Sequence, residues 1–471
     1  MNIESSDRNK NKSKKLLKIV LNNPMITKVD VERKLYGSPQ KISFDKLIDR
    51  TVEKIDEILL NFTRDVTSLY SERNYYYFYL KRKLLVIQMR FLRGVEFDID
   101  TQFEKIISSA NKFEHYDIMI EALHAKQRNY VLKNMRAVNQ IQKLIVRYEE
   151  IGRKVQTTRN IWTRLSVQIS RNASSINYMK ELTVGRKLLR EYFEQTASNT
   201  IGYYYYLVEM DYEQIKGNYK EAEIYIKKLL SLIINNESLY TPTKHGEVLI
   251  NLANNKIFQQ DFNSAIQNAI DGKNYFNSVN YYVATEVEFL ARYYNGEINF
   301  AERLIAEMYN FCRSNGGPFL YSKYGYLFAC IKTNRGEIEK SNELLLEVKE
   351  IEKDKGGWNL GKRILMIING IESSDYEAVE SKVLNLEKFL KRISKASYVR
   401  KRDKIILRIL LKLINENFDF KKVYKLRKKH FDLLEGSDPE YGWKIKSPEL
   451  IVFHEWFKGK MKEKSQQEIS I

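Results

Sequence analysis

Cysteine and proline are both scarce in this chain of 471 residues. The two cysteines, Cys312 and Cys330, are too few for a disulfide framework or a zinc-ligand pattern, and they predict reduced thiols in a cytoplasmic protein. Only six prolines are present, and none lies between residues 40 and 241. Because a proline inside a helix costs about 3 kcal/mol, a stretch this long without proline favours continuous helices.

Long apolar runs and familiar catalytic motifs are also missing. No window approaches the roughly 18 apolar residues of a membrane span, and the short apolar run 16–21 is interrupted by Lys18 and lacks a cleavage site. The five histidines form no metal pair at helical spacing, and there is no nucleophile motif, P-loop or dinucleotide fingerprint. We therefore expect a cytoplasmic protein that is not an enzyme, stays out of the membrane and uses no cofactor or metal.

Positive charge is in excess, with 79 Lys and Arg against 60 Asp and Glu. The excess gathers in residues 391–430, which hold 15 Lys or Arg against Asp403, Glu416 and Asp419. A surface this basic attracts polyanions or acidic protein surfaces. An ordinary solvated face is the other interpretation, because lysine is common throughout this sequence.

Within this basic region, cationic residues recur at helical spacing in two expected helices. Residues 399–415 carry Lys404, Arg408 and Lys412 on one stripe. The next helix places five lysines on the face opposite its apolar residues: Lys421, Lys422, Lys425, Lys428 and Lys429. Stacked, the two helices would present a continuous positive surface to an acidic protein or, through phosphate contacts, to nucleic acid.

A short phrase recurs six times in the second half of the chain. It consists of a small or polar residue, a polar residue, an aromatic residue or Ile, two variable residues and a small side chain. The copies begin at Gly217, Gln260, Gly296, Gly336, Ser374 and Asn417, and end at Ala222, Ala265, Ala301, Ser341, Val379 and Val423. Their regular recurrence predicts an array of helix pairs, each burying its face by stacking on its neighbours.

The phrase resembles that of the tetratricopeptide repeat, over residues 196–434. In that family it lies at the turn between two antiparallel helices and at the start of the second helix. The resemblance implies an all-α fold, with a right-handed superhelix of about five to six helix pairs. This sequence departs from the family in two ways: its repeats exceed the usual period of about 34 residues, and Val379 and Val423 replace a small residue.

The resemblance also implies a binding surface. In this family the first helix of each pair lines a concave face that holds an extended peptide or a partner helix. Carried over by offset from the small residue, this predicts nine groove residues: Asp211, Gln214, Asn251, Asn254, Glu286, Tyr294, Lys323, Tyr326 and Asn334. An ordinary solvated helix position is the alternative at each. The leading hypothesis is therefore a scaffold for protein–protein interaction.

The chain before the array is expected to be helical as well. Residues 1–14 predict a flexible basic tail, 15–65 a small helical segment, and 66–195 a helical region with degenerate repeats. The array then gives way to a terminal segment at 435–471.

That terminal segment predicts a capping helix and a tail. Ser447 suits the N-cap, Pro448 the first helical position and Glu449 the first turn. The apolar residues that follow would cover the exposed end of the array, as terminal caps do in such arrays.

Two further hypotheses concern nucleic acid. The segment 15–65 has the size of a helix-turn-helix module, so the chain would be a transcriptional regulator whose array senses a peptide or protein. Its third helix carries Lys46, Arg50 and Lys54 on one stripe, but acidic residues interleave with them, so a structural role is the alternative. An RNA- or ribosome-associated scaffold using residues 391–430 is the other hypothesis.

Overall fold

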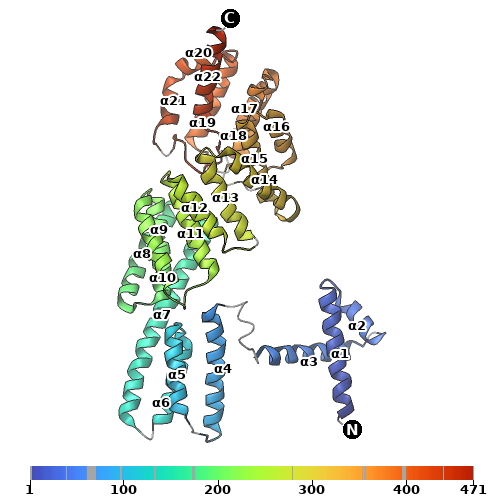
Figure 1. Cartoon of the computed structure of the whole chain (residues 1–471), viewed down its shortest axis with the longest axis vertical. Helices are drawn as coiled ribbons and strands as arrows, with labels where there is room; N and C mark the ends of the chain where they lie inside the picture. The colour runs from blue at the N-terminus through green and yellow to red at the C-terminus, as the bar shows by residue number, and fades with distance from the viewer. Residues whose placement is uncertain are drawn as a thin grey trace. The chain divides into compact units, whose positions relative to one another are not determined.

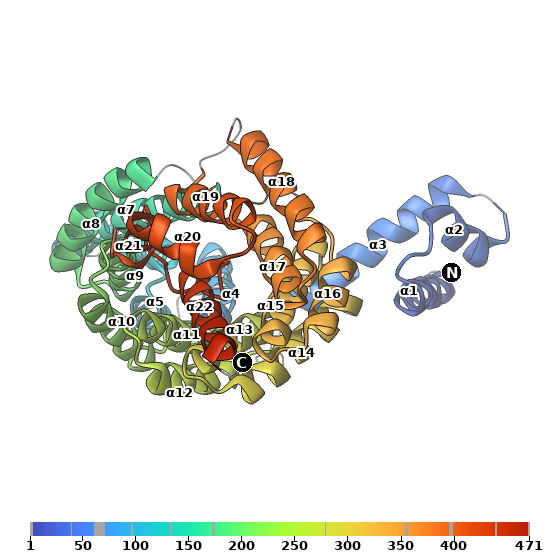
Figure 2. The same ribbon diagram turned by 90° about the horizontal axis from the view of Figure 1, so that it is seen from above.

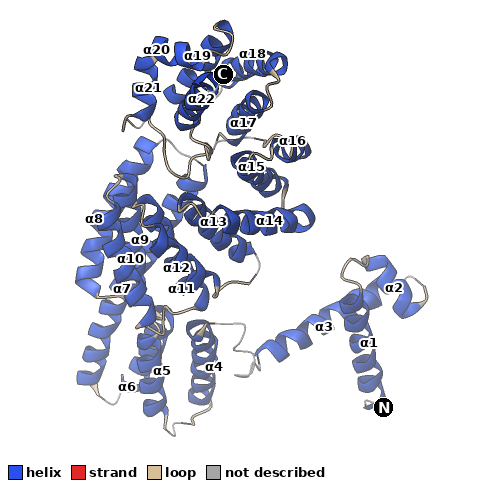
Figure 3. Cartoon of the chain, turned by 45° about the horizontal axis from the view of Figure 1, so that its top comes forward, coloured by secondary structure: helices blue, strands red, loops and turns tan. Residues whose placement is uncertain are grey.

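The computed structural model describes residues 3–38, 40–60, 71–95, 98–131, 134–171, 175–277, 279–352, 354, 357–394, 399–438 and 440–469. Across these residues it contains 22 α-helices joined by turns and loops, and no strand (Figure 3). The predicted all-α fold class is confirmed. The chain divides into two compact units, Met1–Gly152 and Arg153–Ile471, whereas the sequence suggested divisions at residues 65, 195 and 434. The first of these falls within 61–70, outside the described residues.

Unit 1 begins with three helices that are joined by short loops. They are α1 (Ile3–Asn22), α2 (Lys28–Tyr36) and α3 (Lys41–Leu60). Their common core consists of Leu16, Val31, Phe44 and Leu47. Because α1 begins at Ile3, residues 3–14 are helical, and the prediction of a loose tail is wrong for them.

The rest of unit 1 is a second helical group. It comprises α4 (Glu72–Leu92), α5 (Ile99–Lys112), α6 (Tyr116–Tyr130) and the first part of α7 (Met135–Arg171). Leu84 of α4, Phe103 of α5, Met119 of α6 and Ile145 of α7 share one buried cluster. These four helices therefore form a core separate from that of α1–α3.

Unit 2 is a stack of helices in chain order (Figure 1). After the second part of α7 come α8 (Ser175–Thr196), α9 (Asn199–Ile215), α10 (Tyr219–Ile234), α11 (Pro242–Phe258), α12 (Phe262–Lys273), α13 (Val279–Tyr294), α14 (Ile298–Asn315), α15 (Pro318–Asn334), α16 (Ile338–Glu347), α17 (Trp358–Glu372), α18 (Tyr376–Ile393), α19 (Lys401–Asn415), α20 (Phe420–Leu426), α21 (Lys428–Glu435) and α22 (Phe453–Ile469). Each helix from α8 to α19 packs against the next, and together they curve around α22 (Figure 2). This arrangement confirms a helical-repeat solenoid.

The recurring phrase forms the turn within each helix pair. All six of its first residues adopt left-handed backbone conformations, with φ between 47° and 80°: Gly217, Gln260, Gly296, Gly336, Ser374 and Asn417. In each copy the next N–H donates to the carbonyl five residues earlier, as Asn218 does to Glu213 at 2.9 Å. This hydrogen bond ends the first helix of the pair and sets the direction of the second.

The same turn joins α5 to α6 in unit 1. Glu114 has φ of 54°, and the His115 N–H donates to the Ala110 carbonyl at 2.8 Å. The sequence pattern missed this copy because Met119 stands where the phrase has a small residue. In unit 2 the small residues of the phrase are fully buried, as Ala222 and Ala301 show.

The C-terminal region differs from its prediction in two places. The basic segment after α19 is two helices rather than one, and they meet at Arg427. The last helix begins at Phe453, so Ser447, Pro448 and Glu449 do not start it. They lie in a loop between α21 and α22, and we call its residues 440–452 the inner loop. The Glu449 carboxylate still caps α22, because it accepts the Phe453 N–H at 2.8 Å.

The last helix packs against α20 and α21. Phe453 and Phe457 of α22 are fully buried in one cluster with Phe420 of α20 and Phe431 of α21. The terminal helix therefore covers apolar surface that α20 and α21 would otherwise expose.

Candidate functional site

The inner loop lies against the first helices of four consecutive pairs. We call the surface that α11, α13, α15 and α17 present to this loop, together with its continuation along α9, the inner face. All nine predicted groove residues belong to these helices: Asp211 and Gln214 to α9, Asn251 and Asn254 to α11, Glu286 and Tyr294 to α13, and Lys323, Tyr326 and Asn334 to α15. Of these nine residues, Asn254, Tyr294 and Tyr326 form hydrogen bonds with the inner loop.

Three tyrosines of the inner face hold the backbone of the inner loop. The Tyr326 hydroxyl donates to the Pro448 carbonyl at 2.5 Å, and the Tyr293 hydroxyl donates to the Leu450 carbonyl at 3.1 Å. The Lys446 N–H donates to the Tyr294 hydroxyl at 3.0 Å. These three hydrogen bonds hold main-chain groups, so they do not require a particular side chain in the loop.

Burial disfavours ionisation of two of these hydroxyls. It raises the pKa of Tyr294 to about 12 and that of Tyr326 well above its ordinary value. Tyr293 was not among the predicted residues, although it immediately precedes Tyr294 in the sequence.

Side chains of the loop add apolar contacts and one cation. Leu450 is only 2% exposed and belongs to the core of the array. The Trp443 ring meets Tyr294 edge-on, with ring centroids 6.0 Å apart. The Lys446 ammonium donates to the Asn254 side-chain oxygen and lies 5.7 Å from the centre of the Phe258 ring.

The loop fits closely against α15 and α17. An added Cβ at Gly361 would lie 2.7 Å from the Tyr326 hydroxyl oxygen and 3.3 Å from the Pro448 carbonyl oxygen. The remaining cavity beside these residues has a volume of about 20 Å³, room for one water molecule. Glycine at position 361 therefore leaves the space in which Tyr326 reaches the loop.

Charged groups on the inner face are partly paired. Glu286 accepts hydrogen bonds from the Lys323 ammonium at 2.6 and 2.7 Å and from the Tyr324 hydroxyl at 3.1 Å. Lys323 also lies 5.1 Å from the centre of the Trp358 ring. This ion pair leaves little of the Glu286 charge for the nearby Lys446.

Two other carboxyl groups lie in desolvated positions. Burial raises the pKa of Asp211 to about 6, against the opposing effect of a 3.2 Å hydrogen bond from Tyr178. Burial also raises the pKa of Glu247 on α11, while the charge of Lys244 acts in the opposite direction. Glu247, Asn251 and Asn254 have the spacing of one helical stripe.

Two predicted groove residues join neighbouring helices rather than the loop. Gln214 donates to the Asn255 side chain at 3.2 Å, and Asn334 donates to the Tyr293 hydroxyl at 3.4 Å. Asn334 therefore orients a tyrosine that holds the loop, whereas Gln214 links α9 to α11. Asn251 is partly buried.

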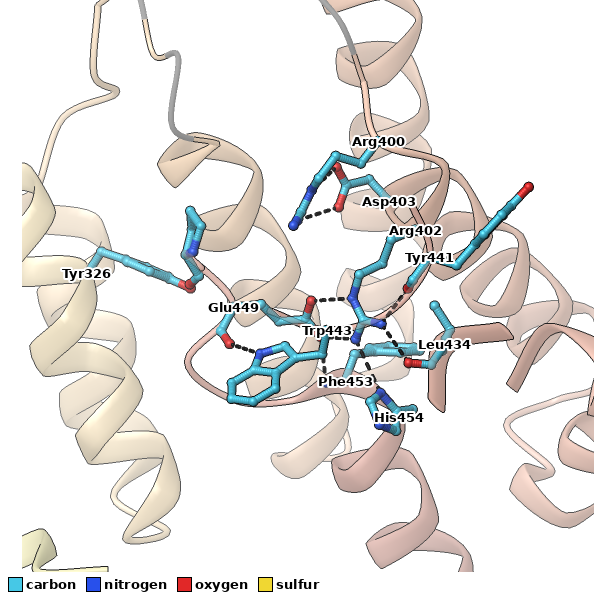
Figure 4. A network of polar contacts seen from close by, with 11 residues as sticks. Tyr326, Arg400, Arg402, Asp403, Leu434, Tyr441, Trp443, Glu449, Phe453 and His454 are labelled. Atoms are coloured by element: carbon cyan, nitrogen blue, oxygen red, sulfur yellow. Dashed lines mark hydrogen bonds and ion pairs between the residues drawn. The ribbon is translucent and has the colours of Figure 1, made fainter. Parts of the chain in front are cut away.

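The two ends of the inner loop are tied together by Arg402 of α19 (Figure 4). Its guanidinium donates to both Glu449 carboxylate oxygens at 2.7 Å and to the carbonyls of Leu434 and Tyr441 at 3.0 and 2.9 Å. It also donates to His454 Nδ1 at 3.2 Å. Sequence reasoning counted Arg402 only as part of a basic region, because nothing local reveals that it is 1% exposed.

The predicted basic surface is partly neutralised. Ion pairs join Lys412 and Lys422 to Glu416 at 2.5 and 2.6 Å, and Lys428 to Asp432 at 2.8 Å. Four other members of the set are exposed: Lys404, Arg408, Lys425 and Lys429. Lys421 is partly buried. Whether this surface binds an acidic partner stays a prediction.

The predicted DNA-contacting residues lie on α3. Lys46 and Arg50 are exposed, and Lys54 is partly buried. Asp49 and Glu53 are exposed on the same helix, as the sequence suggested. A DNA-reading role for α3 remains a prediction.

Two further properties bear on the class of site. Within the described ranges, no helix combines the length and apolar character that crossing a membrane requires. Nor do those ranges bring three or more His, Cys, Asp or Glu side chains together in a way that would hold a metal ion.

Comparison with known proteins yields only remote likenesses. No family model matches the chain, and no curated protein matches its sequence. The apo form of RapI aligns with 83% of this chain and 98% of its own, at 11% identity and a TM-score of 0.45. BtubC (BKLC) from P. vanneervenii aligns with 48% of this chain and 93% of its own, at 12% identity and a TM-score of 0.40. The solenoid assignment therefore stands on the helices of this chain.

Proposed function

We propose that this chain is a protein-interaction scaffold whose inner face binds a peptide segment of a partner protein. The observation that carries this proposal is the hold of Tyr293, Tyr294 and Tyr326 on the backbone of a non-helical segment. Main-chain hydrogen bonds from a rigid helical surface are a general means of binding an extended chain. We assign the repeats to the tetratricopeptide type on their turn phrase, and we assign no catalytic role.

The residues available to a partner extend beyond those that the loop uses. Asn251 of α11 supplies a side-chain amide, which both donates and accepts hydrogen bonds, and Asn254, whose oxygen accepts from Lys446 of the loop, supplies a second. Such groups suit the alternating N–H and carbonyl groups of a peptide. Cys312 and Cys330 are free and buried, which fits the reducing cytoplasm in which we place the protein.

Selection of peptides on the intact chain tests this proposal. A library of random peptides is displayed on phage and selected against the immobilised full-length protein, and the enriched peptides are measured by fluorescence anisotropy. The Asn251→Ala variant should weaken their binding about tenfold, equal to about 1.4 kcal/mol. The matched control is Asn235→Ala, which changes the C-cap of α10, outside the inner face.

The two outcomes separate clearly. Enriched peptides that compete with one another and respond to Asn251→Ala alone support the inner face as the binding site. Failure to enrich any peptide, or equal affinity for both variants, contradicts the proposal.

A second candidate function is DNA binding through α1–α3, with the array as sensor. The observation in its favour is that these helices share a small core of their own, with Lys46 and Arg50 exposed on α3. We would measure binding of the full-length chain to random-sequence duplex DNA at low salt. Loss of binding in Lys46→Ala/Arg50→Ala would support this function. Unchanged binding in that variant, or none in the wild type, would reject it.

A further inference from the structure

We propose that the tip of the inner loop, residues 444–447, is a displaceable internal ligand. It occupies the part of the inner face to which a lysine- or arginine-bearing partner peptide binds. The partner displaces the tip, while Arg402 keeps the base of the loop in place. This inference rests on the proposed peptide-binding function and adds to it the chemistry of the partner and a means of control.

The tip covers polar groups that a partner would use. The Lys446 N–H donates a hydrogen bond to the Tyr294 hydroxyl, and the Lys446 ammonium group donates to the Asn254 side-chain oxygen. Both residues belong to the nine that the repeat pattern assigned to the groove. A partner peptide reaching this part of the inner face must therefore replace Lys446.

The tip is also the poorest-fitting part of the loop. Lys446 has φ of 63°, in the left-handed region that disfavours residues other than glycine. The Ser447 hydroxyl is buried and has no hydrogen-bond partner within the part of the chain that the structure describes. A strained backbone and an unsatisfied hydroxyl both favour release of the tip.

The charge of Lys446 is only weakly compensated. The charges that act on it are those of Glu286, which already binds Lys323 at 2.6 and 2.7 Å, and of Lys323 itself. In agreement, burial lowers the pKa of Lys446 to about 8. The ammonium thus lies where a cation is accepted but not tightly held.

The base of the loop is held far more firmly. Glu449 forms its buried ion pair with Arg402, and the Trp443 indole N–H donates to the Glu449 carbonyl at 2.9 Å. Water has little access to Arg402, because its side chain is 1% exposed. The base of the loop therefore stays bound to Arg402, while its tip can dissociate from the inner face and bind it again.

The surroundings of the tip define the charge of the partner. A cation at the tip meets the Asn254 side-chain oxygen and the Phe258 ring, as the Lys446 ammonium does, and the charge of Glu286 favours it. When the tip dissociates, the Lys446 cation is lost from the inner face. A peptide that carries Lys or Arg restores it, whereas an acidic peptide would add repulsion.

A direct binding experiment tests this inference. The probe is a fluorescein-labelled peptide with the sequence of residues 440–450, and a second probe carries Glu in place of the lysine that corresponds to Lys446. Each is titrated into full-length wild type, Lys446→Ala and Lys446→Glu, with binding followed by anisotropy. Lys444→Ala is the matched control, because Lys444 lies in the same turn but is exposed.

We expect both Lys446 variants to bind the first probe about tenfold more tightly than wild type or Lys444→Ala, because the competing tip is weakened. The probe with Glu should bind the variants about tenfold less tightly than the first probe. Lys446→Glu adds repulsion from Glu286 to the loss of the cation, so it gives a second route to an open tip if Lys446→Ala remains closed.

Other outcomes overturn the inference and distinguish it from the proposed function. Equal affinity of all four proteins for the first probe shows that the tip does not block the inner face. If phage-selected peptides bind wild type and the Lys446 variants equally, the proposed function stands and the inference fails. If neither the probes nor selected peptides bind any of the proteins, both fail.

Discussion

The guanidinium of Arg402 and the carboxylate of Glu449 form a bidentate ion pair, with both nitrogen–oxygen distances at 2.7 Å. The two side chains are only 1% and 7% exposed. One residue belongs to α19 and the other to the inner loop, 47 positions later. The pair therefore joins the array to the segment that lies on its inner face (Figure 4).

Removing one partner of this pair should be strongly destabilising. We expect Arg402→Ala to lower the free energy of unfolding by about 3–5 kcal/mol, because it leaves the buried Glu449 carboxylate without its cation. Urea unfolding of the full-length chain measures this. Arg408→Ala, at an exposed position of the same helix, should stay within about 0.5 kcal/mol of wild type. Similar losses in the two variants would contradict the structural role of Arg402.

Removing both charges should cost less than removing one. In the double variant Arg402→Met/Glu449→Leu no buried charge remains unpaired, so we expect it to regain most of the loss seen in Arg402→Ala. The same urea experiment applies. A double variant as unstable as the single one would show that packing, and not the unpaired charge, causes the loss.

Asp211 should make stability depend on pH. Burial raises its pKa from 3.8 to about 6 in the folded state, so between these values the folded chain binds more protons than the unfolded chain and stability falls as pH rises. Asp211→Asn should then raise the free energy of unfolding by about 1–2 kcal/mol at pH 7.5 and leave it nearly unchanged at pH 4. Urea unfolding at the two pH values checks this, with exposed Glu221→Gln as control. An equal effect at both pH values would refute the assignment.

Asn369 should be a stabilising link between repeats. It is fully buried, accepts from the Thr333 hydroxyl at 2.7 Å, and donates to Ser341 and Asn342 at 2.8 and 2.9 Å. We expect Asn369→Ala to cost about 2–3 kcal/mol, because it removes three hydrogen bonds of a fully buried side chain. Asn342→Ala removes only one of these bonds and should cost about 1 kcal/mol or less. Thermal unfolding would rank the two, and the reverse order would disprove this account.

The left-handed turns predict opposite effects of glycine in two repeats. Ser374 has φ of 58° and Gly336 has φ of 74° at equivalent positions. We expect Ser374→Gly to stabilise by about 0.5 kcal/mol and Gly336→Ala to destabilise by about 1 kcal/mol. Urea unfolding measures both. Destabilisation by Ser374→Gly would mean that its side-chain contacts outweigh the backbone strain.

The array was predictable because its signal is local. A left-handed residue, a following aromatic or Ile and a small side chain are needed at each turn, and the sequence repeats them from Gly217 to Val423. The turn at Glu114 escaped because its small position is Met119, and it was recognised only from its backbone hydrogen bond.

The inner loop was not predictable because distant residues hold it. The local signature of a helix start is present at Ser447, Pro448 and Glu449. However, the Tyr326 hydroxyl donates to the Pro448 carbonyl, and the Arg402 guanidinium donates to the Glu449 carboxylate. These contacts cross 122 and 47 positions of the chain. The repeat pattern assigned Tyr326 to a groove, but it gave no sign that the inner loop would contact it.

Hydrogen–deuterium exchange of the full-length chain, with and without a selected peptide, tests the central claim most directly. If the inner face binds a peptide, exchange should slow in α11 and α13, around Asn254 and Tyr294, and become faster at the tip of the inner loop. The outer helix α12 serves as an internal reference. Slowing confined to α1–α3 or to the basic residues of α19–α21, with no change around Asn254, would contradict the account.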